Sequence, residues 1–351
     1  RATTWAVCAG FLSFSIHAMA VTAPVGATPG ELEVTTRGSA HYSIPIVIPP
    51  GTRGMQPKLS LAYDNQSGNG FIGHAWSLGG LSVIPRCGAT IQIDTFKGGV
   101  KYDSNDRFCL DGERLVNVGG AEYHTRQETW QRVIASGAPS NPDSFTVYAK
   151  DGYILEFGVT EDSRIQAQGS ANVRVWALNK MTDRLGNYYT IHYQEDNANG
   201  DYRPDRIDYT GNATQGLATY NSVVFQYEAR TDTPPRYEAG SVMKTMQRLT
   251  HVLSYTGATL ARDYRFVYDI NGAAGRSRLT SVQECGTDGV CLPATQFTWQ
   301  NGAINYLSPT QFNWSTNKTA DGPIRFADVD GDGQLDFYGW HSDGNIHVRR
   351  W

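Results

Sequence analysis

Short apolar runs separated by turn residues fill most of the 351-residue chain, and this pattern restricts the folds that the chain can adopt. In residues 44–48 isoleucine occupies every second position, and Pro45 indicates a strand at a sheet edge, because proline cannot donate to a ladder. A Pro-Pro-Gly turn at 49–51 follows, and residues 58–63 alternate polar and apolar side chains with the period of a half-buried strand. Similar runs recur up to residue 299, so the sequence predicts an all-β chain.

A glycine-rich loop in this region has the spacing G-x-G-x-x-G, at Gly68, Gly70 and Gly73. A dinucleotide-binding loop needs a helix directly after its last glycine, so that the helix N-terminus faces the pyrophosphate. Here the pair Gly79 and Gly80 follows within a few residues and argues against a helix. We therefore interpret these glycines as turn residues and not as a nucleotide site.

Three segments carry a resemblance to a known family, namely residues 43–86 (SIPIVIPPG to SVIPR), 107–115 (RFCLDGERL) and 283–285 (QEC). They resemble the N-terminal domain of the Salmonella virulence-plasmid 65 kDa B protein (SpvB) family, a domain shared with the B component of insecticidal Tc toxin complexes. The resemblance extends over roughly residues 30–300. It places the family's ADP-ribosyl transfer in a separate C-terminal domain, which no region of this chain matches, and it implies a non-enzymatic module.

Residues 183–189 (DRLGNYY) resemble the YD-type hairpins of Rhs proteins and Tc toxin shells, with a tight Gly-Asn turn and tyrosines that stack across paired strands. No uniform repeat period emerges along the chain. For residues 31–301 we expect an SpvB-like β-domain, built as an irregular multi-stranded β-sandwich or shell. Residues 91–93 are expected to form a strand, and only residues 241–249 (SVMKTMQRL) suggest a helix.

The sharpest metal-binding pattern lies in residues 328–336 (DVDGDGQLD). Oxygen ligands at positions one, three, five, seven and nine of such a loop can converge on one calcium ion, which prefers several hard oxygens. The predicted ligands are the side chains of Asp328, Asp330, Asp332 and Asp336 and the main-chain carbonyl of Gln334. The competing interpretation is a solvated acidic turn.

The sequence around this loop does not fit an EF-hand, because Gly339 stands where the glutamate at position twelve would be and the flanks have the pattern of strands. Residues 323–351 instead resemble a partial FG-GAP/VCBS repeat, which implies the first blade of a β-propeller. Residues 302–322 are expected to be a linker between this repeat and the β-domain.

The N-terminus has the features of a secretory signal peptide. Residues 5–16 are apolar but too few to span a bilayer, and Ala18-Met19-Ala20 offers a cleavage site. We predict a signal peptide over residues 1–20, a linker of small residues and prolines over 21–30, and a secreted product with no membrane span in the mature chain. A buried core helix is the alternative for the apolar run.

Four cysteines remain after such cleavage, and an even number in an exported chain favours disulfides. Proximity suggests the pairs Cys87–Cys109 and Cys285–Cys291, although four cysteines allow three connectivities. A zinc site would need C-x2-C spacing, which is absent. Free thiols in a cytoplasmic product remain an alternative.

The formal net charge of −4 provides no basic footprint for nucleic acid, and the chain contains no HExxH, GxSxG or P-loop motif. We expect a non-enzymatic N-terminal module of an exported, toxin-like protein, part of a β-shell and propeller that holds or delivers a C-terminal effector. Its expected partners are other toxin-complex components or the C-terminal part of the same polypeptide. A secreted, calcium-dependent adhesion protein of the propeller type is the first alternative, and an enzyme with an unrecognised β-fold site is the second.

Overall fold

The computed structural model describes residues 25–36, 38–272, 274–300, 325–327, 336–340 and 345–349. The chain divides into two compact units, residues 1–301 and 302–351, and each is described here by itself. The predicted signal peptide (1–20) and the predicted linker at 302–322 lie outside the described residues, as do residues 21–24 of the predicted N-terminal linker.

A four-stranded antiparallel sheet opens the first unit. Its strands, in spatial order, are β1 (Glu31–Val34), β2 (Ala40–Pro45), β3 (Ser60–Asp64) and β6 (Trp76–Gly79). The predicted alternation is present, since Ile44 and Leu61 are fully buried and lie in register on adjacent strands. The segment after β2 is fastened to a second sheet, because the Val47 amide donates to the Tyr264 hydroxyl over 3.0 Å.

Eight of the following strands close into a barrel. They are β7 (Val83–Cys87), β8 (Arg107–Leu110), β9 (Glu113–Gly119), β10 (Glu122–Thr125), β11 (Arg132–Ala138), β12 (Asn141–Tyr148), β13 (Ile154–Phe157) and β15 (Val173–Thr182). Neighbours in this order are antiparallel, and β15 completes the ring by pairing with both β7 and β13. Phe108, Phe145 and Trp176 fill its interior with edge-to-face contacts at centroid distances of 5.1–5.3 Å.

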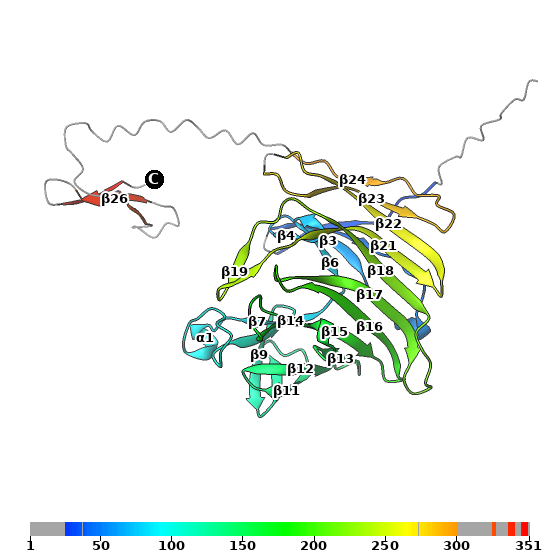
Figure 1. Cartoon of the computed structure of the whole chain (residues 1–351), viewed down its shortest axis with the longest axis horizontal. Coiled ribbons are helices and arrows are strands. Elements are labelled where there is room, and N and C mark those ends of the chain that lie inside the picture. The colour runs from blue at the N-terminus through cyan, green and yellow to red at the C-terminus, as the bar shows by residue number, and fades with distance from the viewer. Residues whose placement is uncertain are drawn as a thin grey trace, which may run out of the picture. The chain divides into compact units, whose positions relative to one another are not determined.

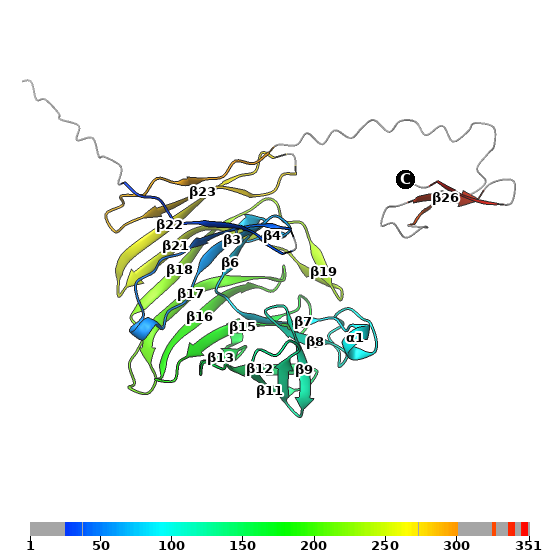
Figure 2. The same ribbon diagram turned by 180° about the vertical axis from the view of Figure 1, so that it is seen from behind.

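From β15 the sheet continues as a long series of antiparallel hairpins, which Figures 1 and 2 show from opposite sides. Its further strands are β16 (Asn187–Asp196), β17 (Asp201–Asn212), β18 (Asn221–Ala229), β21 (Gln247–Thr256), β22 (Thr259–Asp269), β23 (Arg278–Cys285) and β24 (Thr295–Gln296). Barrel and hairpins thus form one continuous hydrogen-bonded sheet. Its core merges with that of the N-terminal sheet, where the Tyr209 hydroxyl donates to the Pro49 carbonyl over 2.8 Å.

Short elements connect these strands, and two of them correct the sequence-based expectation. They are η1 (Thr52–Gly54), β4 (Asn69–Gly70), β5 (Gly73–His74), α1 (Ile91–Asp94), η2 (Glu161–Ser163), β14 (Arg164–Gln166), β19 (Arg236–Glu238) and β20 (Ser241–Met243). Residues 91–93, expected as a strand, form one helical turn. Residues 241–249, expected as a helix, contribute to β20 and β21, because pairing with β19 and β18 overrides local helix propensity.

The glycine-rich loop is a small β4–β5 hairpin and is not followed by a helix. Gly73 has a φ of +90°, and a Cβ there would lie 2.6 Å from the Ser277 carbonyl oxygen. Close backbone contact and a left-handed turn therefore explain this glycine, as the turn interpretation requires.

The second unit contains a three-stranded antiparallel sheet of β25 (Arg325–Ala327), β26 (Asp336–Trp340) and β27 (Ile346–Arg349). Strands were predicted on both sides of the acidic loop, and both are present. Assignment of this sheet to a propeller blade stays a prediction.

The all-β prediction is confirmed for the described residues. The expected irregular sandwich is wrong in detail, because β15 pairs on both sides with barrel strands and closes a ring that the sequence did not reveal. Among the helices of the described ranges, none is long and apolar enough to cross a membrane.

Candidate functional site

The predicted calcium ligands Asp328, Asp330, Asp332 and Gln334 lie outside the residues that the structure describes, and Asp336 is the first residue of β26. Within the described ranges, no group of three or more His, Cys, Asp or Glu side chains is placed to hold a metal ion. The acidic loop therefore stays the candidate metal site on sequence grounds.

All four cysteines of the first unit's described part are disulfide-bonded, in the pairs Cys87–Cys109 and Cys285–Cys291. The first bridge joins β7 to β8, two adjacent strands of the barrel. The second closes a short loop at the end of β23. Both bridges fasten strands near each other in sequence, and they constrain local loops more than the overall topology.

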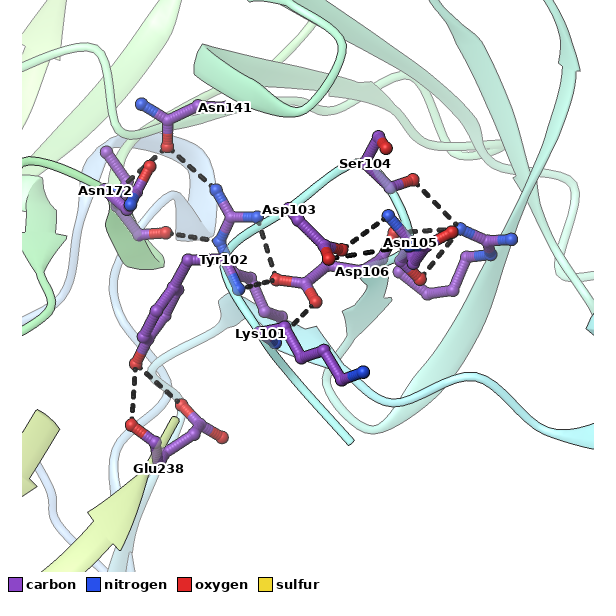
Figure 3. A network of polar contacts seen from close by, with 12 residues as sticks. Lys101, Tyr102, Asp103, Ser104, Asn105, Asp106, Asn141, Asn172 and Glu238 are labelled. Carbon is purple, nitrogen blue, oxygen red and sulfur yellow. Dashed lines mark hydrogen bonds and ion pairs between the residues drawn. The ribbon is translucent and has the colours of Figure 1, made fainter. Parts of the chain in front are cut away.

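A buried arginine organises the interior polar network of the barrel, and Figure 3 labels Asp106 and Asn141 among the residues of this network. Arg86 on β7 has a side chain that is 0% exposed. Its guanidinium donates to Asp106 Oδ2 over 3.1 Å, to Asn141 Oδ1 over 2.8 Å and to the Val173 carbonyl over 2.6 Å. A buried charge needs this number of partners because its desolvation is costly.

Aromatic rings complete the surroundings of the guanidinium. Its central carbon lies 5.5 Å from the Trp176 ring centroid, 5.7 Å from that of Tyr102 and 5.8 Å from that of Phe108. Cation–π attraction adds to the hydrogen bonds in such a dry site. The Asp106 carboxylate, the hydrogen bonds and the aromatic rings together stabilise the buried charge of Arg86, which therefore has a structural role.

Asp106 also holds the loop between α1 and β8 in place through hydrogen bonds. Its carboxylate accepts the amides of Lys101 and Tyr102, each over 2.8 Å, in addition to the Arg86 bond. The Tyr102 hydroxyl reaches the β19 hairpin, where it lies 3.4 Å from a Glu238 carboxylate oxygen (Figure 3). Burial, with the nearby Glu238 charge, raises the pKa of this hydroxyl. The network thus links the barrel to the hairpin.

A second charged cluster lies beside the first disulfide. Asp94 accepts from Arg107 over 2.7 Å and from Arg114 over 2.6 Å. Burial disfavours the Asp94 carboxylate, but hydrogen bonds from the Thr90 amide and the two arginines outweigh it and lower the pKa. These groups border a hollow of about 390 Å³, and each of the two arginines there is paired with Asp94.

A third cluster fixes the glycine-rich hairpin to the long sheet. The fully buried Arg230 side chain donates to Gly70 O over 2.6 Å, to Asn69 Oδ1 over 2.7 Å and to Asp232 Oδ2 over 2.6 Å. Asp232 also accepts the Ser277 amide over 2.7 Å. Burial disfavours the Asp232 carboxylate, but the bonds from Arg230, Ser277 and Asn69 outweigh it and hold its pKa well below the ordinary value.

None of these three clusters has the arrangement of a catalytic site. Each joins an acid to at least one arginine, and the lowered pKa values of Asp94 and Asp232 make these two carboxylates poor general bases. The His251–Asp263 pair, at 2.8 Å, is similar, because Arg265 bonds the second carboxylate oxygen of Asp263. The sequence did not indicate these clusters, since most of their contacts join segments that are far apart, although Arg230 and Asp232 are neighbours in the sequence.

Comparison with known proteins supports the family resemblance. Residues 34–133 match the family model of the Salmonella virulence plasmid 65kDa B protein, SpvB, so the predicted resemblance is confirmed for this segment. Comparison with curated proteins gives no match.

Solved toxin structures share the fold. A TcdB2–TccC3 crystal structure matches with a TM-score of 0.68 and 19% identity over 96% of this chain and 21% of that chain. The Photorhabdus luminescens Tc holotoxin pore gives 0.68 and 19% over 94% and 19% of the two chains. The N-terminal domain of the effector SpvB from Salmonella typhimurium strain LT2 gives 0.57 and 18% over 69% and 98%. The chain therefore spans about a fifth of the Tc chains and nearly all of the SpvB domain.

The Arg86 network predicts a large loss of stability when its cation is removed. In Arg86→Met, Asp106 keeps a buried carboxylate without its counter-charge, which typically costs about 3–5 kcal/mol. Urea denaturation measures the free energy of unfolding. Arg132→Met is the matched control, since its side chain is 58% exposed and pairs at the surface with Glu122. Equal losses in the two variants would contradict a dominant role for the buried network.

Asp232 predicts a pH dependence of a defined sign. Because its pKa is lowered in the folded state, its stabilisation is complete above the unfolded value of about 3.9 and is lost as the pH falls toward the folded value. Asp232→Asn should therefore lower Tm at pH 6, and the Tm difference from the wild type should shrink between about pH 4 and pH 2. A Tm difference that stays constant over this range would show that Asp232 ionisation does not stabilise the fold.

Proposed function

We propose that this chain is a non-enzymatic structural module of an exported, toxin-like protein, and that it forms part of a β-shell that holds or delivers an effector. The observation that carries the proposal is a sealed barrel continuous with a long antiparallel sheet, an architecture shared along nearly the whole chain with the TcdB2–TccC3 structure. A continuous sheet whose described charged groups form no catalytic cluster is better suited to a role as the wall of a β-shell than to a role in catalysis.

The proposed partners follow from the same comparison. The matching chains belong to a TcdB2–TccC3 assembly and a Tc holotoxin pore, and this chain would correspond to about a fifth of such a protein. We propose that it associates with further toxin-complex components or with other parts of its own polypeptide. Export through the signal peptide ending at Ala20 is part of this proposal and rests on the sequence.

The reading frame beyond residue 351, together with the structure of its full product, tests the shell proposal. We expect further YD-type hairpins leading to a variable C-terminal region, and electron cryomicroscopy of the product should show a closed shell that includes residues 31–301. A frame that encodes only further propeller blades, with no YD-type hairpins, would contradict the shell and favour the calcium-dependent adhesion protein.

The acidic loop provides a separate proposal, that residues 328–336 bind calcium. Isothermal titration with Ca²⁺ should give one site, with Kd of about 10⁻⁴–10⁻³ M if the loop resembles extracellular calcium modules. Asp330→Asn with Asp332→Asn should abolish it, because two of the charged oxygen ligands are lost. Glu31→Gln with Glu33→Gln, on the exposed strand β1, is the control with equal charge change. Calcium binding that survives in the loop variant would overturn this site.

A further inference from the structure

A pocket of about 320 Å³ lies between the N-terminal sheet, the long sheet and the β19–β20 hairpin, elements that can be followed in Figure 1. We call it the inter-sheet pocket. One part of its wall is apolar and consists of Phe71, Leu78 on β6, Leu81 and Val83 on β7. Its volume is at the small end of the range of ligand pockets, about 300–1,000 Å³. The apolar wall suits the hydrocarbon body of a small molecule.

The rest of the pocket wall carries an excess of positive charge. Four cations line it, namely Arg174 on β15, Arg203 on β17, Arg236 on β19 and Lys244, against a single carboxylate, Asp201. This excess is unusual in a chain whose formal net charge is −4. A cavity that concentrates one sign of charge attracts ligands of the opposite sign.

Most of this positive charge is not neutralised by the protein. Arg203 lies 3.5 Å from Asp201. Within the described ranges, Arg174, Arg236 and Lys244 have no carboxylate oxygen within ion-pair distance. The other charged clusters of this chain pair every arginine with an acid, so the inter-sheet pocket differs from them.

The two arginines deeper in the fold also have spare hydrogen-bond donors. Arg174 donates to Met243 Sδ over 3.0 Å and to the Gly200 carbonyl over 3.1 Å, which uses two of the five N–H groups of a guanidinium. Its Nε and that of Arg203 are buried without a hydrogen-bond partner among the described residues. An arginine fork with unused donors is suited to a carboxylate.

Glu195 on β16 is the nearby acid that interacts with Arg174, but it does not line the pocket. Burial, with the charges of Asp162 and Glu161, raises its pKa to about 7. It is therefore only partly ionised at neutral pH and leaves the Arg174 charge incompletely compensated.

We propose that the inter-sheet pocket binds a small organic anion with an apolar body, of the fatty-acid class, whose carboxylate lies against the cations and whose chain lies against Phe71, Leu78 and Leu81. The apolar wall alone would accept any small hydrocarbon, and the cations alone would accept inorganic phosphate. Both walls together select a carboxylate on a hydrophobic chain. The proposal is independent of the shell function.

Titration calorimetry of the full chain at pH 7 tests the proposal, with decanoate and decan-1-ol as probes of equal chain length. Hydrogen bonds to a charged group contribute about 1.5–3 kcal/mol, so decanoate should bind at least about tenfold more tightly than the alcohol. Equal affinities, or no saturable binding of decanoate below its micelle-forming concentration, would overturn the anion site.

Variants of the exposed Arg236 and the half-buried Lys244 make the test specific. Arg236→Gln with Lys244→Gln removes two charges whose side chains have no acidic partner in the described part of the chain, so folding should be preserved. Decanoate affinity should fall about tenfold or more, while decan-1-ol affinity stays unchanged. Lys58→Gln with Lys97→Gln, two exposed lysines elsewhere, is the matched control. An equal fall of decanoate affinity in this control would show that the loss comes from the change in net charge, and it would refute a specific anion site.

Discussion

The structure depends on how one strand, β15, divides its backbone hydrogen bonds. Residues 175–177 pair with β7 and residues 180–182 pair with β16, while the opposite edge pairs with β14 and β13. A strand ordinarily has two neighbours, and four are possible here because β15 is ten residues long and each partner pairs with only part of its length. The same strand therefore closes the barrel and starts the long sheet. Trp176, at its middle, is fully buried and also donates to the Pro142 carbonyl over 2.9 Å.

Buried ion pairs join the parts that β15 does not reach. Arg86 attaches the α1–β8 loop to the barrel interior, and Arg230 attaches the β4–β5 hairpin to the long sheet. Such pairs contribute modest net stability because their desolvation is costly, yet they have strict geometry. They determine where irregular segments lie. The inter-sheet pocket contrasts with them, because its cations lie beside an apolar wall without equivalent acids.

The sequence predicts strands well where one face is buried. Ile44, Ile46 and Ile48 are all buried, as their alternation indicated, although β2 ends at Pro45 and residues 46–48 are not part of a strand. Closure of the barrel was not predictable in this way, because it depends on Val83 pairing with Ala177, and no local pattern encodes that register. Residues 91–93 show the competing effect, since hydrogen bonds of Asp94 to Thr90, Arg107 and Arg114 stabilise a helical turn where alternation suggested a strand. The arginine clusters also escaped prediction, because contacts such as Arg86 with Val173 and Arg230 with Gly70 join residues that are distant in sequence.

Closure of the barrel makes the two ends of the large sheet different. The pairing of β13 with β15 uses the edge that would otherwise be exposed at the barrel end, so along the main strand order of the described residues the sheet ends at β24, while β14 pairs with β15 at the side. That last strand is two residues long, and such short edges resist unwanted pairing with other chains. The large sheet of the first unit is therefore closed at the barrel and open at β24. Residues 83–182, which form the barrel, make up the closed end of the sheet, and the later strands extend from it in one direction.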